Sequence, residues 1–503
     1  MKRGGLLGID IGTSSSKGVL VDDDGRVLAS AVRPHCVSLP QAGWAEHDPD
    51  TVWWRDFCSI SRSLVGETHL SPGCVAVSGI GPCLLPGDAD GAALRPAILY
   101  GVDTRATAEI AELAERYGSS RILDRCGSVL SSQAVGPKLL WLRGNEPDVW
   151  ARTRKLFTAQ SHVVYRLTGA YVIDHHSASQ CTPLYDVHAR DWIENWVGDL
   201  CDGVELPELV WPSDVVGTVT SDAAEETGLS AGTPVIAGTI DAWAEAFSIG
   251  VERPGDLMLM YGTTMFLVLV VDTVRPDELL WTTAGTFPGT TTVAAGMSTS
   301  GALTSWLREL TGRPPHESLL EEAALAGPGA GGLIVLPYFA GERTPLYDPA
   351  ARGCVFGLTL RHGRGHLYRA ALEATAFGVR HILETIAEAG HPVERASIAG
   401  GGTRGRLWPA IVSDVTGRPQ EVPKQLIGAC YGDAALAFIA LHGHSPIGDW
   451  NPVSEVIEPD PSTRELYDAL YSLYRELYPE TREQIHALAS LQTKLEGAFS
   501  AAP

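Results

Sequence analysis

The sequence predicts an α/β protein built from two related halves, and two repeated patterns support this. An apolar run, a turn rich in Gly and Thr, and a second apolar run occur at residues 6–22 and again at residues 256–271. Residues 74–81 and 396–402 form a second pair, each a short apolar run that leads into glycines. Because internal repeats indicate duplicated structural units, we expect the two halves to face each other across a cleft.

The length and composition fit two folded domains. The chain has 503 residues, of which 45% are hydrophobic and 19% charged. Such a chain suits two cores of about 250 residues each, which we expect at residues 1–250 and 251–503. The formal net charge of −22 argues against nucleic acid or an anionic membrane as a partner, because both would repel the chain.

Cysteine spacing and the N-terminus bear on the compartment. The nine cysteines show no Cys-x-x-Cys spacing, so neither a zinc site nor a dense disulfide framework is expected. Lys2 and Arg3 precede only a short apolar run that Asp10 interrupts, which is unlike a signal peptide. The longest apolar stretch, near Met265, is too short to span a bilayer. We therefore expect a cytoplasmic protein with no membrane partner.

The first turn has the composition of a phosphate-binding loop. Residues 6–9 and 19–21 are expected to be strands, and the segment between them supplies a glycine for close backbone approach, hydroxyls, exposed amides and a positive charge. An ordinary polar hairpin explains the turn alone equally well. The residues expected to contact phosphate are Gly12, Thr13, Ser14 and Lys17.

Asp10 ends the first expected strand and predicts a metal ion. A carboxylate beside a phosphate is repelled unless a cation lies between them. Mg²⁺, held directly by the carboxylate or through water, would meet that requirement.

The rest of the first half alternates expected strands and helices. A third strand at residues 26–32 completes a meander, a loop at 42–49 contains Trp44, and a helix follows at 51–65. Trp44 could stack on a sugar, and a structural role explains it equally well. A buried strand at 74–78 leads through glycines, including Gly81, and a further strand at 98–100 precedes Asp103, Arg105 and a helix at 106–117. By its position alone, Asp103 could be the N-cap of that helix.

The first domain is expected to end in connecting structure and a strand. His175 and His176 lie in a polar segment that we expect to be extended, where neighbours point to opposite faces and chelate a metal poorly. Residues 204–233, which include Pro207, Pro212 and many small residues, are expected to be connecting structure that ends the first domain. A strand at 233–237 then runs into Gly238 and a helix at 242–249, and spacing alone would make Asp241 the N-cap of this helix.

The second half repeats the order of the first. The second Gly-Thr turn is expected at Gly262, Thr263 and Thr264, and helices at 300–311 and 365–389. A strand at 396–399 leads into Gly400, Gly401 and Gly402. The chain from residue 462 onward is expected to be helical, and it suits either an outer layer of the second domain or a homodimer contact.

Seven motifs in this order make the chain resemble the FGGY family of carbohydrate kinases, within the actin, hexokinase and heat-shock ATPase superfamily. The resemblance implies two actin/hexokinase-like (ribonuclease H-like) domains with an ATP cleft between them, and ATP with Mg²⁺ as cofactors. The motifs are GIDIGTSSSKGVLVD at 8–22, AGWAEHDP at 42–49, RPAILYGVDTR at 95–105, GTIDAWAEA at 238–246, YGTT at 261–264, YFAGERTPLYDPAARGCVFGL at 338–358 and AGGGTRGRLWPAIVSDVTG at 399–417.

The resemblance also implies a role for each candidate residue. Asp241 occupies the Gly-x-x-Asp position of the family's general base, which takes the proton of the attacking sugar hydroxyl. With Asp10 it would also hold the metal ion. The residues implied to contact the sugar are Trp44, Gly81, Asp103, Arg105 and Asp241, and those implied to contact the nucleotide are Gly301, Gly400, Gly401 and Gly402 in addition to the two turns.

The chain resembles the xylulokinase branch of the family more than the glycerol kinase branch, but it departs from that branch at one sugar-contacting motif. That branch carries a Met-His pair at the sugar, where this chain has Ile80-Gly81-Pro82-Cys83. We therefore expect an ATP-dependent kinase for a primary hydroxyl of a small sugar, with a ketopentose such as xylulose as the leading substrate and ribulose, glycerol or erythritol types as alternatives. The two domains are expected to close and exclude water.

Two other classes of protein share part of the pattern. Residues 400–405 fit G-x-G-x-x-G after a strand, with Glu421 about twenty residues on, as in a Rossmann dehydrogenase that binds NAD. That class explains neither Gly-Thr turn nor Asp241. A heat-shock-type ATPase or an actin-like scaffold would share both turns, but it has no use for Asp103, Arg105 and Asp241 together.

Overall fold

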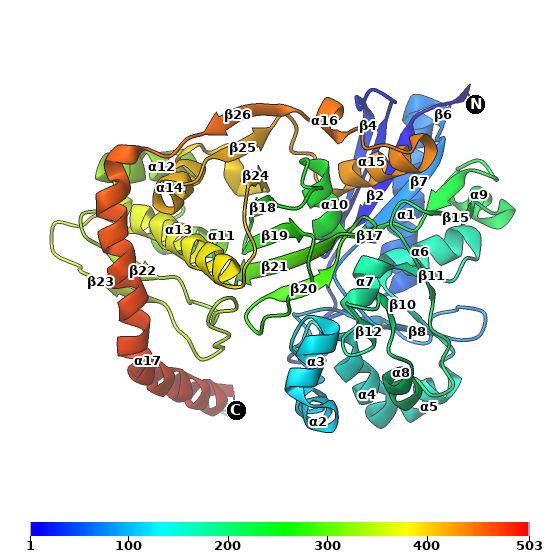
Figure 1. Cartoon of the computed structure of the whole chain (residues 1–503), viewed down its shortest axis with the longest axis horizontal. Coiled ribbons are helices and arrows are strands. Elements are labelled where there is room, and N and C mark those ends of the chain that lie inside the picture. The colour runs from blue at the N-terminus through cyan, green and yellow to red at the C-terminus, as the bar shows by residue number, and fades with distance from the viewer. Residues whose placement is uncertain (1, 501–503) are drawn as a thin grey trace. The chain divides into compact units, whose positions relative to one another are not determined.

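The computed structural model describes residues 2–500, which form two compact units (Figure 1). The first unit runs to Pro254 and also takes in Val270–Val293 and Gln425–Pro452. The second unit comprises Gly255–Leu269, Ala294–Lys424 and the chain from Val453 on. A segment near the end of the chain, Gln425–Pro452, thus folds with the N-terminal half.

A seven-stranded mixed sheet forms the centre of the first unit. Its order is β15-β16-β7-β2-β3-β4, and β17 also pairs with β7. Strand β2 is parallel to β7 and antiparallel to β3, while β7 is parallel to β16 and β17. The strands are β2 (Leu6–Ile11), β3 (Ser15–Val21), β4 (Val27–Pro34), β7 (Cys74–Gly79), β15 (Val215–Thr218), β16 (Pro234–Ile236) and β17 (Thr239–Ile240).

Two helices cover opposite faces of this sheet, and the side chains of β2 point alternately toward one and the other. Leu7, Ile9 and Ile11 share a core with α1 (Arg55–Thr68), whereas Leu6 belongs to the core beneath α15 (Ala429–His442). A Cβ at Gly8 would meet the Cys430 carbonyl oxygen at 2.0 Å, so α15 lies directly on this strand. Because side chains alternate along a strand, Asp10 lies on the α15 face together with Leu6 and Gly8.

Short strand pairs and helices complete the first unit. The pairs are β1 (Lys2–Arg3) with β6 (Leu70–Ser71), β5 (Glu46–His47) with β9 (Ala97–Ile98), β8 (Leu85–Gly87) with β10 (Lys155–Phe157), β11 (Val172–Asp174) with β14 (Glu208–Val210), and β12 (Tyr185–Asp186) with β13 (Asp191–Trp192). The helices, besides α1 and α15, are a π-helix at Pro49–Trp54, α2 (Thr107–Tyr117), α3 (Ser119–Cys126), α4 (Val135–Asn145), α5 (Pro147–Arg152), α6 (Ala159–Thr168), α7 (His175–Ser179), α8 (Glu194–Leu200), α9 (Ser221–Thr227), α10 (Asp241–Ser248) and α16 (Ile447–Trp450).

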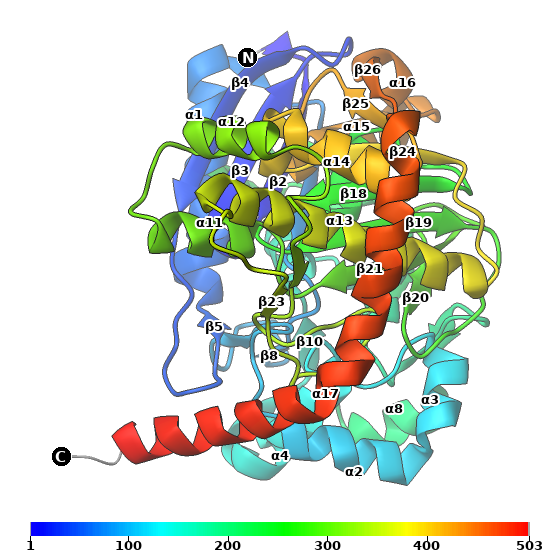
Figure 2. The same cartoon turned by 90° about the vertical axis from the view of Figure 1, so that its left-hand side faces the viewer.

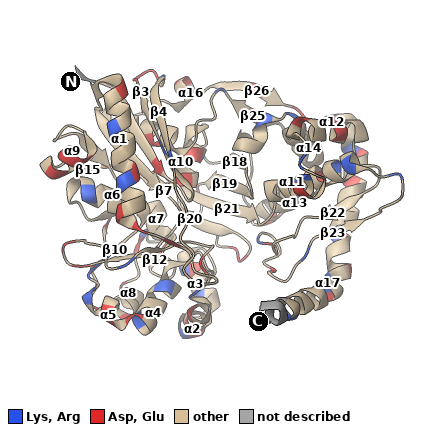
Figure 3. Cartoon of the chain, turned by 180° about the vertical axis from the view of Figure 1, so that it is seen from behind, with Lys and Arg blue, Asp and Glu red and all other residues tan. Residues whose placement is uncertain are grey.

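The second seven-stranded sheet repeats the directions of the first. Strand β18 is antiparallel to β19 and parallel to β24, which is parallel to β25, and β25 is antiparallel to β26. The same series describes β2 with β3, β7, β16 and β15, so the expectation of an α/β fold from two related halves is confirmed. In Figure 3, β19 and β21 carry no charged side chain. The strands, in sheet order, are β20 (Trp281–Ala284), β21 (Thr291–Met297), β19 (Met265–Val271), β18 (Asp256–Tyr261), β24 (Arg395–Ala399), β25 (Gln420–Pro423) and β26 (Val453–Ile457).

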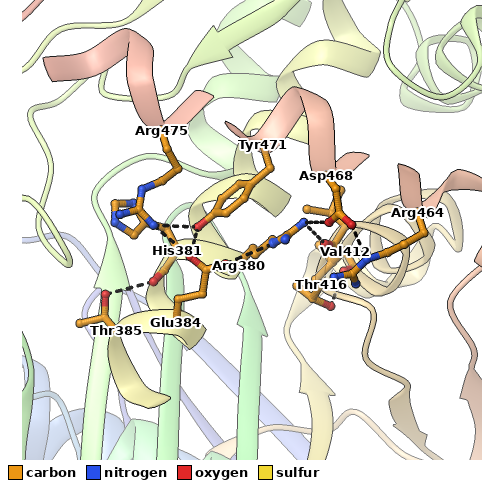
Figure 4. Close-up of polar contacts among 11 residues, drawn as sticks. Arg380, His381, Glu384, Thr385, Val412, Thr416, Arg464, Asp468, Tyr471 and Arg475 are labelled. Atoms are coloured by element: carbon orange, nitrogen blue, oxygen red, sulfur yellow. Dashed lines mark hydrogen bonds and ion pairs between the residues drawn. The ribbon is translucent and has the colours of Figure 1, made fainter. Parts of the chain in front are cut away.

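The C-terminal helix α17 (Arg464–Ser500) packs as an outer layer of the second unit, beside α13 and α14 (Figures 1 and 2). Its buried side chains include Tyr467, Tyr474 and Tyr478. Figure 4 shows its polar contacts with α13, where Arg380 Nη1 binds Asp468 Oδ1 at 2.6 Å and Arg475 Nη1 binds Glu384 Oε2 at 2.9 Å. The other elements of this unit are α11 (Gly301–Leu310), α12 (His316–Ala326), β22 (Ile334–Leu336), β23 (Cys354–Phe356), α13 (Arg364–Glu388), α14 (Leu407–Thr416) and 3₁₀ turns at Gly401–Arg404 and Pro461–Thr463.

Two local predictions are wrong. The segment at 204–233, expected to be connecting structure, contains β14, β15 and α9. His175 and His176 lie in the short helix α7 rather than in an extended segment, because Asp174 acts as its N-cap and accepts a hydrogen bond from the Ser177 N–H. His176 is fully buried.

Its hydrogen bonds hold His176 in the neutral state. Nδ1 lies 2.8 Å from the Ala284 carbonyl oxygen, which can only accept, and Nε2 lies 2.8 Å from the Gln180 amide nitrogen, which can only donate. Protonation would place two donors face to face. Burial in addition lowers the pKa of His176 from 6.5 to about 3.

We expect His176 to make folding weaker in acid. Between pH 6.5 and pH 3, His176 binds a proton in the unfolded chain but not in the folded chain. The free energy of unfolding therefore falls as the pH falls, by about 1.4 kcal/mol per pH unit. His176→Gln should therefore show a shallower loss of stability than the wild type when urea unfolding is measured at pH 7.5, 6.0 and 5.0. Parallel pH profiles for the two proteins would contradict this assignment.

Candidate active site

Three parallel strands of the first sheet end side by side at polar residues. Asp10 on β2 is in register with Ser78 on β7, and Ser78 is also in register with Thr239 on β17. Asp241 follows directly as the first residue of α10. In open α/β sheets, ligands bind outside the carboxyl ends of such strands. The first unit therefore offers a candidate site at this edge.

Gly238 permits the tight connection between β16 and β17. Its φ is 70°, which is the left-handed region, and a Cβ there would lie 1.8 Å from the Val77 carbonyl oxygen. Only glycine fits between these strands. The Gly of the Gly-x-x-Asp motif thus brings β17 against β7 and fixes the point at which α10 starts.

Asp241 is not the N-cap that spacing alone suggests. Ile240 occupies the N-cap position, and the Asp241 side chain accepts a hydrogen bond from the Ala242 N–H at 2.7 Å. Burial raises the pKa of Asp241 to about 7, the negative charge of Glu245 adds to the rise, and the Ala242 N–H and Lys17 oppose it. A carboxylate with such a pKa can take up a proton near neutral pH.

Asp433 on α15 joins Asp10 and Asp241 in this site, and sequence reasoning missed it. Ser78 Oγ donates a hydrogen bond of 2.6 Å to Asp433 Oδ2. Burial, followed by the charges of Asp241 and Asp433, raises the pKa of Asp10 well above its usual range. Burial and the charge of Asp241 likewise raise the pKa of Asp433. The buried carboxylates repel each other, so a cation would stabilise their ionised forms.

The chemistry of these carboxylates fits a hydrated Mg²⁺. Among residues 2–500, Oδ1 of Asp10 and Oδ1 of Asp433 are buried without a hydrogen-bond partner. The described chain holds no group of three or more His, Cys, Asp or Glu side chains arranged to enclose a metal ion. Mg²⁺ needs no such cage, because it usually keeps several waters and takes one or two carboxylates together with substrate phosphates.

Asp103 and Arg105 form a buried ion pair. Asp103 Oδ2 accepts hydrogen bonds from Arg105 Nη2 at 2.7 Å and from the Ala45 N–H at 2.7 Å, and Oδ1 accepts from Arg105 Nε at 3.0 Å. Both side chains are inaccessible to solvent. The N-cap of α2 is Ala106, so the interpretation of Asp103 as its N-cap is wrong.

Trp44 and Gly81 also have defined surroundings. The Arg105 guanidinium lies 3.9 Å from the centre of the Trp44 ring, so one face of this indole is covered by a cation. A Cβ at Gly81 would meet the Tyr100 ring at 3.2 Å, and the Tyr100 hydroxyl lies 3.0 Å from Thr13 Oγ1. A small pocket beside Asp103 is lined in part by Ser132 and Lys138. Sugar contact by Trp44, Gly81, Asp103 and Arg105 stays a prediction.

The second unit brings its candidate residues together at the ends of β18 and β24. The turn after β18 packs on the start of α11, where the Gly301 N–H donates to the Gly262 carbonyl oxygen at 3.0 Å and the Ala302 N–H to the Thr263 carbonyl oxygen at 3.0 Å. A Cβ at Gly400, after β24, would meet the Tyr261 carbonyl oxygen at 2.6 Å. Residues Gly262, Thr263, Thr264, Gly301, Gly400, Gly401 and Gly402 therefore surround one edge of this sheet.

Comparison with known proteins identifies the family. The N-terminal domain of the FGGY family of carbohydrate kinases matches residues 6–248, and the C-terminal domain of that family matches residues 257–441. The chain belongs to the FGGY family of carbohydrate kinases. It is thus a phosphotransferase that acts on a sugar or polyol. The dehydrogenase alternative is wrong, and Gly401–Arg404 forms a 3₁₀ turn rather than the start of a Rossmann helix.

FGGY relatives with different substrates resemble the chain to a similar degree. A xylulose kinase from Escherichia coli is 29% identical, over 94% of this chain and 98% of the relative. A glycerol kinase from Gloeobacter violaceus is 30% identical, over 92% of each. The crystal structure of a xylulose kinase from Rhodospirillum rubrum matches with a TM-score of 0.90 and 33% identity, covering 96% of this chain and 99% of that one. Within residues 2–500, no helix is long and apolar enough to cross a bilayer.

Proposed function

We propose that this FGGY kinase transfers the γ-phosphoryl group of ATP to a primary hydroxyl of a small ketose, with Asp241 as the general base. The position of Asp241 carries the proposal, because its carboxylate stands at the start of α10 beside the ends of β2 and β7 and has a pKa of about 7. A sugar hydroxyl is a weak nucleophile and needs a carboxylate to take its proton.

The reaction divides between Asp241 and the phosphate groups. The Asp241 carboxylate accepts the hydroxyl proton while the hydroxyl oxygen forms a bond to the γ-phosphorus. The bond from that phosphorus to the oxygen bridging to the β-phosphate breaks, and ADP leaves with the bond electrons. Mg²⁺, held by Asp10 and Asp241, would neutralise phosphate charge during transfer. Asp433 is a further candidate ligand, because its Oδ1 is buried without a hydrogen-bond partner.

ATP is assigned to the glycine and threonine residues of both units. In the first unit these are Gly12, Thr13 and Ser14, which precede β3, and Lys17, which is in register with Asp10. In the second unit the exposed Thr263 and Gly401 leave backbone open to a ligand. The amides of such turns can bind phosphate oxygens. The proposed ATP residues of the second unit are Gly262, Thr263, Thr264, Gly301, Gly400, Gly401 and Gly402.

The substrate we propose first is a ketopentose such as xylulose, bound near Trp44, Gly81, Asp103 and Arg105. The xylulose kinases among the similar proteins support a ketopentose, and the glycerol kinases of similar identity make a polyol the alternative. A coupled assay of ADP release over pentuloses, hexuloses, pentitols and glycerol tests the proposal. Turnover highest with xylulose is expected, and turnover confined to glycerol would replace the ketose with the polyol.

Gly401 offers a direct test of the ATP assignment. Apart from its own turn of the chain, no described residue has a heavy atom within 4 Å of a Cβ added at Gly401, so the fold tolerates a side chain there. Gly401→Val should raise the KM for ATP about tenfold, while the KM for sugar and the melting temperature stay near the wild-type values. Gly363→Val, where the space is equally open, is the control. An unchanged KM for ATP would remove Gly401 from the nucleotide site.

A further inference from the structure

A buried pair, His35 and Asp56, contacts the buried side of the turn at Gly12 to Ser14. The register of β3 and β4 pairs Ser15 with Pro34, so His35 emerges beside the turn at Gly12 to Ser14. Asp56 reaches the same place from the first turn of α1. The exposed fractions of the His35 and Asp56 side chains are 3% and 5%. These two residues thus meet inside the protein, beneath a turn whose Ser14 is exposed.

His35 contacts the turn at two points. Its ring Nε2 lies 3.0 Å from the Gly12 carbonyl oxygen, and its backbone N–H donates to the Ser14 carbonyl oxygen at 3.0 Å. On the other side of the ring, Nδ1 lies 2.8 Å from Asp56 Oδ2, which also accepts a hydrogen bond of 3.1 Å from Ser16 Oγ. The contacts form a continuous chain from α1 to the turn.

The chemistry of these atoms fixes the direction of the hydrogen bonds. A carbonyl oxygen can only accept, so Nε2 must donate to Gly12, and Nδ1 on the other side of the ring is hydrogen-bonded to the Asp56 carboxyl group. The neighbouring His47 ring lies 5.1 Å away between centroids, and burial and, next, the electrostatic effect of His35 lower the pKa of His47 to about 4.

Fixing two carbonyl groups also orients the amides of the turn. A trans peptide is planar, with its N–H opposite its C=O. When the Gly12 carbonyl points at His35, the Thr13 N–H must point away from it, and the Ser14 carbonyl orients the Ser15 N–H in the same way. The amides that follow Gly12 and Ser14 are therefore directed away from the buried side of the turn.

We propose that His35, held by Asp56, is a positioning residue that presents the amides of the Gly12 to Ser14 turn to the phosphates of ATP. The inference rests on the proposed function, because it requires the turn to bind phosphate. His35 itself touches no substrate. Its loss should weaken phosphate binding by leaving the turn free to rotate its peptides.

Two variants of His35 separate positioning from packing. The amide nitrogen of Gln can replace Nε2 and still donate to Gly12, whereas Asn reaches only the position of Nδ1 and Asp56. We expect His35→Asn to weaken binding of Mg·ATP about tenfold and His35→Gln by less than threefold, with adenosine binding unchanged in both. Arg33→Ala is the control, because Arg33 Nε donates to Ser59 Oγ and likewise ties β4 to α1 without touching the turn.

Calorimetric titration of each folded protein with Mg·ATP and with adenosine gives a decision. Selective loss of Mg·ATP affinity in His35→Asn supports the proposal, as does a long-range ¹H–¹⁵N spectrum with a proton on His35 Nε2. Equal Mg·ATP affinity in His35→Asn and the wild type overturns the inference alone. A wild type that binds no Mg·ATP overturns the proposed function and this inference with it.

Discussion

An Asp241→Asn variant is expected to fold and to bind ATP and sugar while its kcat falls by roughly 10² to 10⁴, the range for positioned proton transfer. Asn has the same shape as Asp and can still accept the hydrogen bond from the Ala242 N–H. It has no basic oxygen to take the hydroxyl proton. The loss should therefore appear in kcat rather than in the KM for either substrate.

The control for this variant is Asp222→Asn. Asp222 lies in the first turn of α9, so its carboxylate also stands at a helix N-terminus of the first unit, but it is exposed. Asp222→Asn should change stability by less than about 1 kcal/mol and leave kcat unchanged. Steady-state kinetics of both variants, with melting temperatures to establish folding, distinguish the two roles. A kcat near the wild-type value in folded Asp241→Asn would show that Asp241 is not the base.

The fold, the two Gly-Thr turns and Asp241 could be predicted from local patterns in the sequence. Strands β2 and β18 are apolar runs that end at Gly-Thr turns, so their repetition reveals the two halves. Asp241 is marked by its Gly-x-x-Asp motif, which comes directly after an expected strand. Asp433 carries no such signal. It lies within an apolar helix whose packing on β2, rather than any motif, brings it to Asp10.

Short elements were harder to predict because tertiary contacts decide them. The helix α7 has five residues and depends on its cap at Asp174. Strands β14 and β15 have three and four residues, and β14 pairs with β11, which is distant from it in the sequence. His35 has no motif either. Its role emerges only from the register of β3 with β4 and from the way α1 packs against that edge of the sheet.

Asp103→Ala is expected to lower the free energy of unfolding by about 3–5 kcal/mol, the usual cost of removing one partner from a buried ion pair. Arg105 would lose its bonds to both oxygens of Asp103 and keep Glu46, whose Oε1 lies 2.8 Å from Arg105 Nη1. The same Glu46 oxygen also contacts Arg95 Nη2, so the charge of Glu46 is shared between two guanidinium groups. The guanidinium of Arg105 would then remain buried with only part of its charge balanced.

The matched control is Asp50→Ala, which breaks an Arg–Asp pair of the same unit at the surface. Asp50 Oδ1 lies 2.7 Å from Arg166 Nη1, and the exposed fraction of the Asp50 side chain is 64%. Exposed pairs contribute about 0–1 kcal/mol, so this variant should unfold almost as the wild type does in urea. Equal losses in both variants would contradict the structural role of Asp103. A higher KM for sugar in folded Asp103→Ala, with the KM for ATP unchanged, would show that the ion pair also positions the sugar site. The reason is that water and the freed Arg105 would occupy the place that the carboxylate holds in the wild type.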